Sequence, residues 1–392
     1  MSSSGDEGMW EGKNAEDDLE NFSHVNTKFA QPTIANSKPH IKVVDGAMYK
    51  SDKKMVPHLD ISENPGEVFV TRFSPDGGLL AAGCGDGAIR VFKTETGRLS
   101  YNLNVTNASA LPTTAIAFRP ASGVSKTRNV LLAVNSDGSV QHWHVTSGRC
   151  LHEIRDEKNP LLTVDYNPDG TKFATAGRDA CIRIYDEATK TQISKMQGGM
   201  MSTQKPLDVS LGHSNRVFSL KFCNFDDNFV VSGGWDNTIQ IWDTRIEMAV
   251  RSFYGPHVCG DALDVKDGKI LTGSWRQDHQ LQLWDFGTGK IIEEIKWGGE
   301  NSKNDCMLYC AKFSNDASLI AAGGSGKNEA KIFDRKNNYA TVGTVAGLSR
   351  GVYSLDFNSD GSKFVVAGGD ATIRIFNIEN KNSGADEEKY KE

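Results

Sequence analysis

The sequence has little proline, no long apolar run and no secretory leader. Only 11 of its 392 residues are proline, against 39 glycines. No apolar stretch approaches the roughly 20 residues that a membrane-spanning helix needs. The first twenty residues have neither the basic start nor the apolar centre of a signal peptide. We therefore expect no membrane segment, and we expect a chain with many tight, glycine-bearing turns.

The charge distribution gives no reason to expect a nucleic-acid partner. The formal net charge is −6; residues 1–40 hold seven acids and three bases (−4), and residues 378–392 hold five acids and three bases (−2). The remainder is therefore neutral. Proteins that bind nucleic acid concentrate Lys and Arg in a stripe or patch. Nothing in this sequence resembles such a stripe.

The cysteine spacing and the lack of catalytic motifs argue against a metal site and against catalysis. The seven cysteines are odd in number and irregularly spaced, which predicts free thiols in a reducing compartment. Cys306 and Cys310 are four residues apart, but no second Cys/His pair accompanies them. The sequence contains no phosphate-binding loop, no G-x-S-x-G, no H-E-x-x-H and no paired-Cys redox motif. We expect no metal, no cofactor and no catalytic residues.

What the sequence does contain is a repeat, which is clearest in residues 212–243. This stretch reads GHSNRVFSLKFCNFDDNFVVSGGWDNTIQIWD, so it begins with Gly-His and ends with Trp-Asp. Three strand-like runs, VFSLKF, FVVSG and TIQIW, are separated by turns rich in Asn, Asp and Gly. A unit of about 40–45 residues with these marks is typical of a propeller blade.

The repeat recurs seven times, with a period of 42 to 57 residues. The aromatic residues that close the third strand are Phe92, Trp143, Tyr185, Trp242, Trp284, Phe333 and Phe376. An aspartate precedes this aromatic in six repeats: Asp86, Asp137, Asp179, Asp236, Asp278 and Asp370. The chain thus resembles the WD-repeat (WD40) family. The resemblance implies an all-β fold, a single seven-bladed β-propeller of four-stranded antiparallel blades, closed by an N-terminal strand.

The two ends of the chain set the expected domain limits. We expect an acidic disordered tail over residues 1–40, the propeller over 41–378 and a polar acidic tail over 379–392. No strand pattern follows the third strand of the seventh repeat, and an open edge would leave backbone groups unpaired. By analogy with the family, we expect Ile41–Val44 to fill that place. Three aromatic residues in the N-terminal tail are either stray or part of a docking motif: Trp10, Phe22 and Phe29.

The resemblance also assigns a structural role to residues that look catalytic. His213, Ser232, Asp236 and Trp242 match the family's hydrogen-bonded tetrad. In it the aspartate accepts from the histidine, and the serine links the histidine to the indole nitrogen. Such a network rigidifies a blade when every member is satisfied. The fourth repeat alone has the full set, so the other blades are expected to depend more on apolar packing.

In this family the narrow upper face and the channel mouth often bind peptides. The mouth is lined by the residue four before the first-strand aromatic. By alignment, these positions are Phe69, Thr114, Leu162, Phe218, Asp261, Tyr309 and Tyr353. The surrounding turns add Arg178, Trp235, Trp275 and Arg276. Aromatic faces beside a carboxylate would suit an inserted Lys or Arg side chain. The alternative is that the aromatic residues only plug a narrow mouth.

Together these features predict a non-enzymatic scaffold or adaptor for protein–protein interactions, a monomeric propeller within a larger complex. We expect it to be intracellular and cytoplasmic, with nuclear, cytoskeletal or ciliary association left open. The alternative is an enzyme or small-ligand-binding propeller with its site in the channel mouth, because the fold alone does not decide function. Converging groups with strongly shifted pKa values would favour that alternative.

Overall fold

The computed structural model describes residues 40–42, 51–62, 64–104, 111–121, 129–198, 211–298 and 306–381. Within these ranges the secondary structure is 29 β-strands and one short 3-10 helix, Val145–Ser147. None of the described helical structure has the length and apolar character needed to cross a bilayer. Residues 38–392 form one compact unit.

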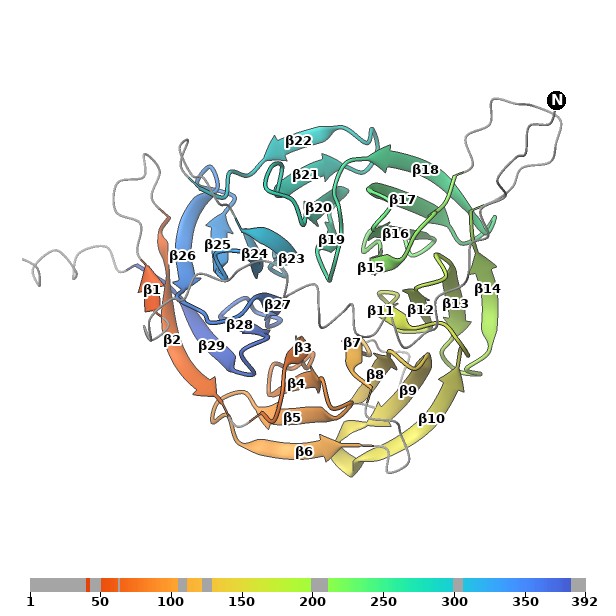
Figure 1. Cartoon of the computed structure of the whole chain (residues 1–392), viewed down its shortest axis with the longest axis horizontal. Helices are drawn as coiled ribbons and strands as arrows, with labels where there is room; N and C mark the ends of the chain where they lie inside the picture. Colours follow the sequence, from red (N-terminus) through yellow and green to blue (C-terminus); the bar gives the residue numbers. More distant parts are fainter. Residues whose placement is uncertain are drawn as a thin grey trace, which may run out of the picture. The chain divides into compact units, whose positions relative to one another are not determined.

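The strands form seven antiparallel sheets arranged around an axis (Figure 1). Blades one to three consist of β3 (Val68–Phe73), β4 (Leu79–Cys84), β5 (Ile89–Lys93) and β6 (Leu99–Leu103); β7 (Thr113–Phe118), β8 (Val130–Asn135), β9 (Ser139–His144) and β10 (Arg149–Arg155); and β11 (Leu161–Tyr166), β12 (Lys172–Gly177), β13 (Ile182–Asp186) and β14 (Gln192–Met196). Blades four and five consist of β15 (Val217–Phe222), β16 (Phe229–Gly234), β17 (Thr238–Asp243) and β18 (Met248–Tyr254); and β19 (Leu263–Lys266), β20 (Lys269–Gly273), β21 (Leu281–Asp285) and β22 (Ile291–Glu294).

Blades six and seven include the N-terminal strands. Blade six consists of β23 (Met307–Phe313), β24 (Leu319–Ser325), β25 (Ala330–Asp334) and β26 (Ala340–Ala346), with β1 (His40–Lys42) added; blade seven consists of β27 (Val352–Phe357), β28 (Lys363–Gly368), β29 (Ile373–Asn380) and β2 (Lys53–Ile61). The innermost strands contact one another in sequence around the axis, and β27 contacts β3. The predicted seven-bladed propeller of four-stranded blades is therefore confirmed.

The strands of a blade differ in how deeply they are buried. Two of the second strands, β8 and β24, are buried at every position, and the other five are buried everywhere except at their first residue, whereas the outer strand β22 is exposed at every position. A strand covered on both faces by neighbouring sheets has to be apolar on both sides. The resulting cores lie between blades: Ile182 and Ile184 of blade three pack with Leu220 and Trp242 of blade four. No blade therefore has a complete core of its own.

The segment that closes the seventh blade lies later in the chain than the sequence analysis predicts. The strand β2 pairs with β29, whereas β1 pairs with β26 as a fifth strand of blade six. The expectation that Ile41–Val44 fills the vacant edge is therefore wrong. The segment KKMVPHLDI was overlooked because of its charges and Pro57. A proline is tolerated at a bulge of an edge strand, and the register of β2 shifts between Pro57 and Leu59.

Truncation distinguishes the roles of β1 and β2. Among the described residues, deleting residues 1–50 removes only β1, the fifth strand of blade six, and should change the melting temperature little. Deleting residues 1–61 removes the outer strand of blade seven and should prevent folding or lower the melting temperature sharply. The buried Met55 of β2 offers a milder variant: Met55→Ala should cost about 2–5 kcal/mol. Equal thermal melts for the two truncations would contradict this account of closure.

Candidate functional site

Six of the seven predicted mouth residues lie at a β-bulge of an innermost strand. They are Phe69, Thr114, Leu162, Phe218, Tyr309 and Tyr353. At each of them the register with the second strand shifts by one residue. A bulge leaves one residue out of the ladder and re-aims its side chain. Asp261, the seventh, lies just before β19, where the described register has no shift.

Aromatic rings form a continuous series on the upper face, which we define by the turns between second and third strands and the linkers between blades. We call this series the aromatic arc; its members in spatial order are Phe69, Tyr353, Tyr309, Trp275, His257, Trp235 and Phe218. Neighbouring ring centroids are between 5.2 and 6.5 Å apart. The arc crosses blades one, seven, six, five and four. The structure thus brings six predicted residues together.

His257 was missed by the sequence interpretation and joins the two tryptophan turns. It lies in the linker before β19, which has no repeated position to mark it. Its Nδ1 donates to Asn237 Oδ1 at 2.7 Å, so Nε2 is left as an acceptor in the neutral ring. Burial and the nearby charge of Arg276 lower the pKa of His257. The imidazole is therefore neutral at pH 7.

Cationic side chains lie in the upper turns, and one of them stacks on the arc. The guanidinium of Arg216 lies 5.0 Å from the centroid of the Trp235 ring, at a distance typical of a cation–π contact. Arg178 and Arg276 are half-buried in the turns after β12 and β20. The Trp275 indole nitrogen donates to Ser325 Oγ at 3.4 Å. The upper face therefore combines aromatic surface with arginine.

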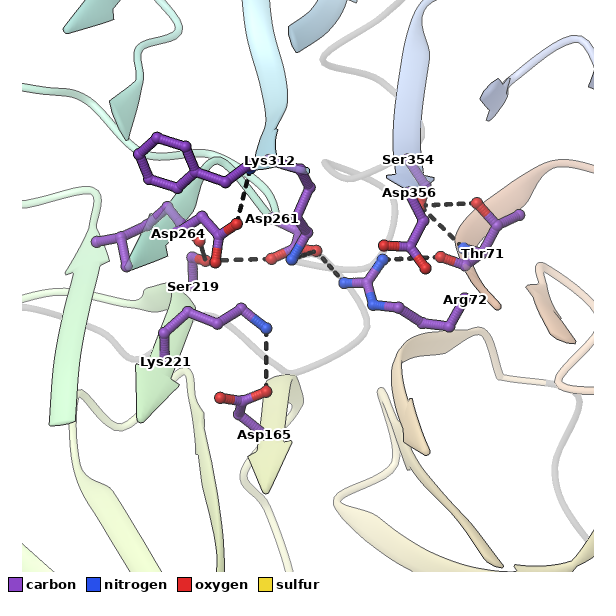
Figure 2. Close-up of polar contacts among 12 residues, drawn as sticks. Thr71, Arg72, Asp165, Ser219, Lys221, Asp261, Asp264, Lys312, Ser354 and Asp356 are labelled. Atoms are coloured by element: carbon purple, nitrogen blue, oxygen red, sulfur yellow. Dashed lines mark hydrogen bonds and ion pairs between the residues drawn. The ribbon is translucent and has the colours of Figure 1, made fainter. Parts of the chain in front are cut away.

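Asp261 does not present a free carboxylate at the mouth. Figure 2 shows it facing Arg72 of blade one and Lys312 of blade six. Its Oδ2 forms an ion pair with the Arg72 guanidinium and a 3.0 Å contact with Lys312 Nζ. Burial alone would raise the pKa of Asp261, but the charges of Arg72, Lys312 and Lys221 hold it well below its usual range. The acceptor expected for an inserted Lys or Arg is already neutralised by the chain itself.

Asp261 pairs with two members of a ring of charged residues that the sequence interpretation missed. The residue before the first-strand aromatic, or before Val265 in blade five, is charged in six of seven repeats: Arg72, Asp165, Lys221, Asp264, Lys312 and Asp356. Each of the three acids accepts the backbone N–H of the next blade's first-strand aromatic, at Phe222, Phe313 and Phe73, with distances of 3.0, 2.9 and 2.9 Å. Lys221 also pairs with Asp165 at 3.1 Å (Figure 2). These bonds join blades around the axis.

The tetrad of blade four forms one hydrogen-bonded chain. Trp242 Nε1 donates to Ser232 Oγ at 2.8 Å, and Ser232 Oγ lies 2.6 Å from His213 Nε2. His213 Nδ1 lies 2.7 Å from Asp236 Oδ2. Because the carboxylate can only accept, the proton order runs from indole through hydroxyl and imidazole to carboxylate. Ser232 is fully buried, so its hydroxyl has no open approach for a substrate.

Blades one, three and seven replace the histidine of the tetrad by an arginine. The turn aspartate pairs with an arginine four residues later on the third strand. The pairs are Asp86–Arg90 at 2.5 Å, Asp179–Arg183 at 2.6 Å and Asp370–Arg374 at 2.7 Å. The expectation that these blades depend mainly on apolar packing is therefore incomplete. The signal was present in the sequence as D-x-x-x-R in DGAIR, DACIR and DATIR.

Comparison with known proteins agrees with this architecture. The WD domain, G-beta repeat family matches residues 60–93, 148–186, 204–243 and 340–377. These segments contain the first three strands of blades one, three, four and seven, and two of them begin with the outer strand of the preceding blade, β10 or β26. All seven blades share the same strand order. The chain is a WD-repeat protein. The family match leaves out the first three strands of blades two, five and six.

Relatives of this WD-repeat protein are distant. The cell division cycle 20.1 protein of Arabidopsis thaliana, a cofactor of the APC complex, is 22% identical over 287 residues, which cover 63% of this chain and 61% of that protein. A ribosome biogenesis protein WDR12 homolog of Drosophila erecta is 22% identical over 319 residues, covering 79% and 71%. The homolog of Nematostella vectensis is 23% identical over 263 residues, covering 62% and 61%. The chain thus spans less than two thirds of the Arabidopsis and Nematostella relatives.

The contribution of the tetrad to the free energy of unfolding can be compared with that of the Asp86–Arg90 pair in blade one. Asp236→Ala leaves the buried His213 without its acceptor and should destabilise by about 1–3 kcal/mol. Asp86→Ala is the matched control, because the Asp86 side chain is 40% exposed and an exposed ion pair contributes only about 0–1 kcal/mol. Urea unfolding measures both. Equal losses for the two variants would show that the tetrad contributes no more than a surface ion pair.

Removing the charge of Asp261 tests the axial cluster. Asp261→Asn leaves Arg72 and Lys312 without their counter-charge and should cost about 3 kcal/mol at pH 7. Because the folded-state pKa of Asp261 is lowered, its contribution is complete above the unfolded-state pKa of about 3.9. The difference from wild type should therefore stay constant from pH 7 to pH 5 and shrink only at lower pH. The exposed Asp278 supplies the control, Asp278→Asn, which should change stability little.

Proposed function

We propose that this protein is a non-enzymatic scaffold that binds a protein partner through its upper face, with the aromatic arc at the centre of the contact. The observation that carries the proposal is the continuity of the arc across five blades. Phe69, Trp235, Trp275, Tyr309 and Tyr353 each keep part of their surface exposed. Large aromatic side chains bury much area on binding and lose little entropy. Trp, Tyr and Arg are also the residues enriched in interface hot spots.

The alternative, an enzyme or a small-ligand site in the mouth, has less support. Ionisable groups with strongly shifted pKa values do converge near the axis, at Arg72, Lys221 and Asp261. The ion pairs of Arg72 with Asp261 and of Lys221 with Asp165 account for these shifts, and the charges are already compensated. The Ser-His-Asp set of blade four is buried in the tetrad. The hydroxyl of the tetrad is buried, and the axial charges are already held in ion pairs.

The proposed setting is a multiprotein complex in which a monomeric propeller is one component. Two of the relatives are named for such work, one as a cofactor of the APC complex and one for ribosome biogenesis. Those names describe the relatives; for this chain they support an intracellular protein with protein partners. A cytoplasmic location stays a prediction, as do the proposed domain limits at residues 40 and 378. Trp10, Phe22, Phe29 and the 199–210 linker lie outside the described residues.

Substitution of one arc tryptophan tests the proposal. Trp235→Ala or Trp275→Ala should weaken capture of the natural partner by about 2 kcal/mol or more, roughly thirtyfold in affinity. Affinity purification of the full chain followed by mass spectrometry identifies the partner, and circular dichroism checks folding. Phe225→Ala is the matched control: Phe225 is an aromatic residue, 44% exposed, in the turn after β15 on the opposite face.

One outcome would contradict binding through the upper face. If both tryptophan variants capture every partner as wild type does, while Phe225→Ala abolishes capture, the binding face is the lower one.

A further inference from the structure

The strand β1 lies on the outer edge of blade six, beside β26 (Figure 1). Its three residues pair antiparallel with the last three residues of β26: His40 with Ala346, Ile41 with Val345 and Lys42 with Thr344. Each of the other six sheets has four strands within the described residues. Because β2 and not β1 completes blade seven, the ring closes without β1. The position of β1 therefore has to be explained by the edge on which it lies.

The outer strand β26 has neither the charges nor the proline that protect many sheet edges. Such residues discourage pairing with another chain. Five of the seven outer strands contain at least one charged residue: β2, β10, β14, β18 and β22. The strand β26 reads ATVGTVA, without charge or proline, and at seven residues it is longer than β6, the other uncharged outer strand. It is therefore the outer strand most open to pairing with a further strand.

The cover that β1 provides for this edge is short. Within the described residues β1 pairs with positions 344–346, and residues 340–343 of β26 have no strand partner on their outer side. Three residues is the lower limit of the usual strand length. Ten residues, 43–52, connect β1 to β2 and span up to about 35 Å when extended. β1 can therefore leave the edge while β2 stays in blade seven, and a longer strand would form ladder hydrogen bonds that β1 does not form.

The edge also contains a buried hydroxyl group without a hydrogen-bond partner. Thr344 is 3% exposed, and its Oγ1 has no partner among the described residues. A buried hydroxyl group that stays unpaired lowers stability. In an antiparallel pair, Thr and Ser side chains that lie directly opposite a Thr can form a hydrogen bond with it. A strand with Thr or Ser in the register of Lys42 would therefore supply the missing partner.

We propose that the outer edge of β26 is a second binding site, where an extended segment of a protein partner is added as a strand in place of β1, with Ser or Thr opposite Thr344. Strand addition derives affinity from main-chain hydrogen bonds and specificity from alternate side chains. The edge is preformed, because Val345 of β26 is held in the core between blades six and seven. The site is on an outermost strand, apart from the aromatic arc, and does not depend on the proposed upper-face contact.

In the absence of a partner, β1 occupies the same site and competes for it. A strand tethered by a short linker has an effective concentration in the millimolar range, so it excludes an identical free segment at lower concentrations. A partner segment displaces β1 by pairing along more of β26 and by satisfying the hydroxyl group of Thr344. Because β26 has no charged residue, binding is expected to change little with salt.

Proline substitution in the full chain releases β1 and supplies its own control. Successive N–H groups of a strand point to opposite sides. Either Ile41→Pro or Lys42→Pro therefore removes an N–H directed at β26, whereas the other removes one directed at solvent, which an edge strand tolerates. Amide hydrogen exchange shows which variant has lost the pairing, because the outward N–H groups of β26 then exchange faster. We call that variant the released chain, and the other is its matched control.

Peptide binding to these variants is measured by fluorescence anisotropy. One fluorescein-labelled probe carries residues 38–46 of this chain, KPHIKVVDG, and the second carries the same segment with Lys42→Thr. The released chain should bind the second probe at least tenfold more tightly than the matched control does, and more tightly than it binds the first probe. Thr344→Val in the released chain should remove the preference between the probes. A third probe with both Ile41→Pro and Lys42→Pro lacks an N–H on either side and should not bind.

The natural partner is examined with the same variants. A protein that uses this edge should be retained more strongly by the released chain than by the matched control, and the unlabelled Lys42→Thr peptide should elute it. In the released chain, Trp235→Ala should leave the binding of both probes unchanged, because Trp235 belongs to the aromatic arc. Failure at the edge of blade six and failure at the upper face can therefore be told apart.

Three results would overturn the assignment of this edge. The released chain binds neither of the first two probes, a bound probe leaves amide exchange in β26 unchanged, or the preference for the Lys42→Thr probe persists after Thr344→Val. A dimer of the released chain that excludes the probes would also overturn it, because a second copy of this chain would then be the occupant. If the edge fails in these ways while Trp235→Ala abolishes partner capture, the proposed function stands and only the second site is rejected.

Discussion

Packing between neighbouring sheets is the interaction on which the rest of this structure depends. The second strand of every blade is covered on both faces, and each apolar core contains side chains from two blades. Burial of apolar surface is the main favourable term in folding. A single blade cannot bury its faces alone, so the ring has to close. β2 completes that closure, because Met55 packs in the core between blades six and seven and Ile61 in the core between blades seven and one.

The polar groups around the axis are subject to a second constraint, which is that buried charges have to be paired. Seven inner strands meet where few apolar side chains can fit, and buried charges are tolerated only when they are paired and hydrogen-bonded. Here the acids accept backbone N–H groups of the next blade, and Asp261 neutralises cations from blades one and six. Charged residues thereby tie together strands that are distant in sequence. The same pairing removes Asp261 from the binding surface.

The aromatic arc is a consequence of this scaffold. A bulge at the same position of six inner strands turns one side chain per blade towards the upper face, and the repeat leaves the identity of that side chain free. Blades two and three carry Thr114 and Leu162 there, whereas four other blades carry aromatic residues. The arc is therefore one-sided. It gives an otherwise pseudo-symmetric disc a particular place for a partner.

The sequence by itself determined the number of blades, the strands within them and the tetrad residues, because these depend on local alternation and on a repeated spacing. It also named six of the seven arc residues. Only the tertiary structure decided which charged residues form ion pairs with one another. The partners Arg72, Asp261 and Lys312 are separated by 51 residues or more, and no local pattern links them. Closure by β2 and the place of His257 were decided in the same way, since both depend on contacts between segments that meet only when the ring is complete.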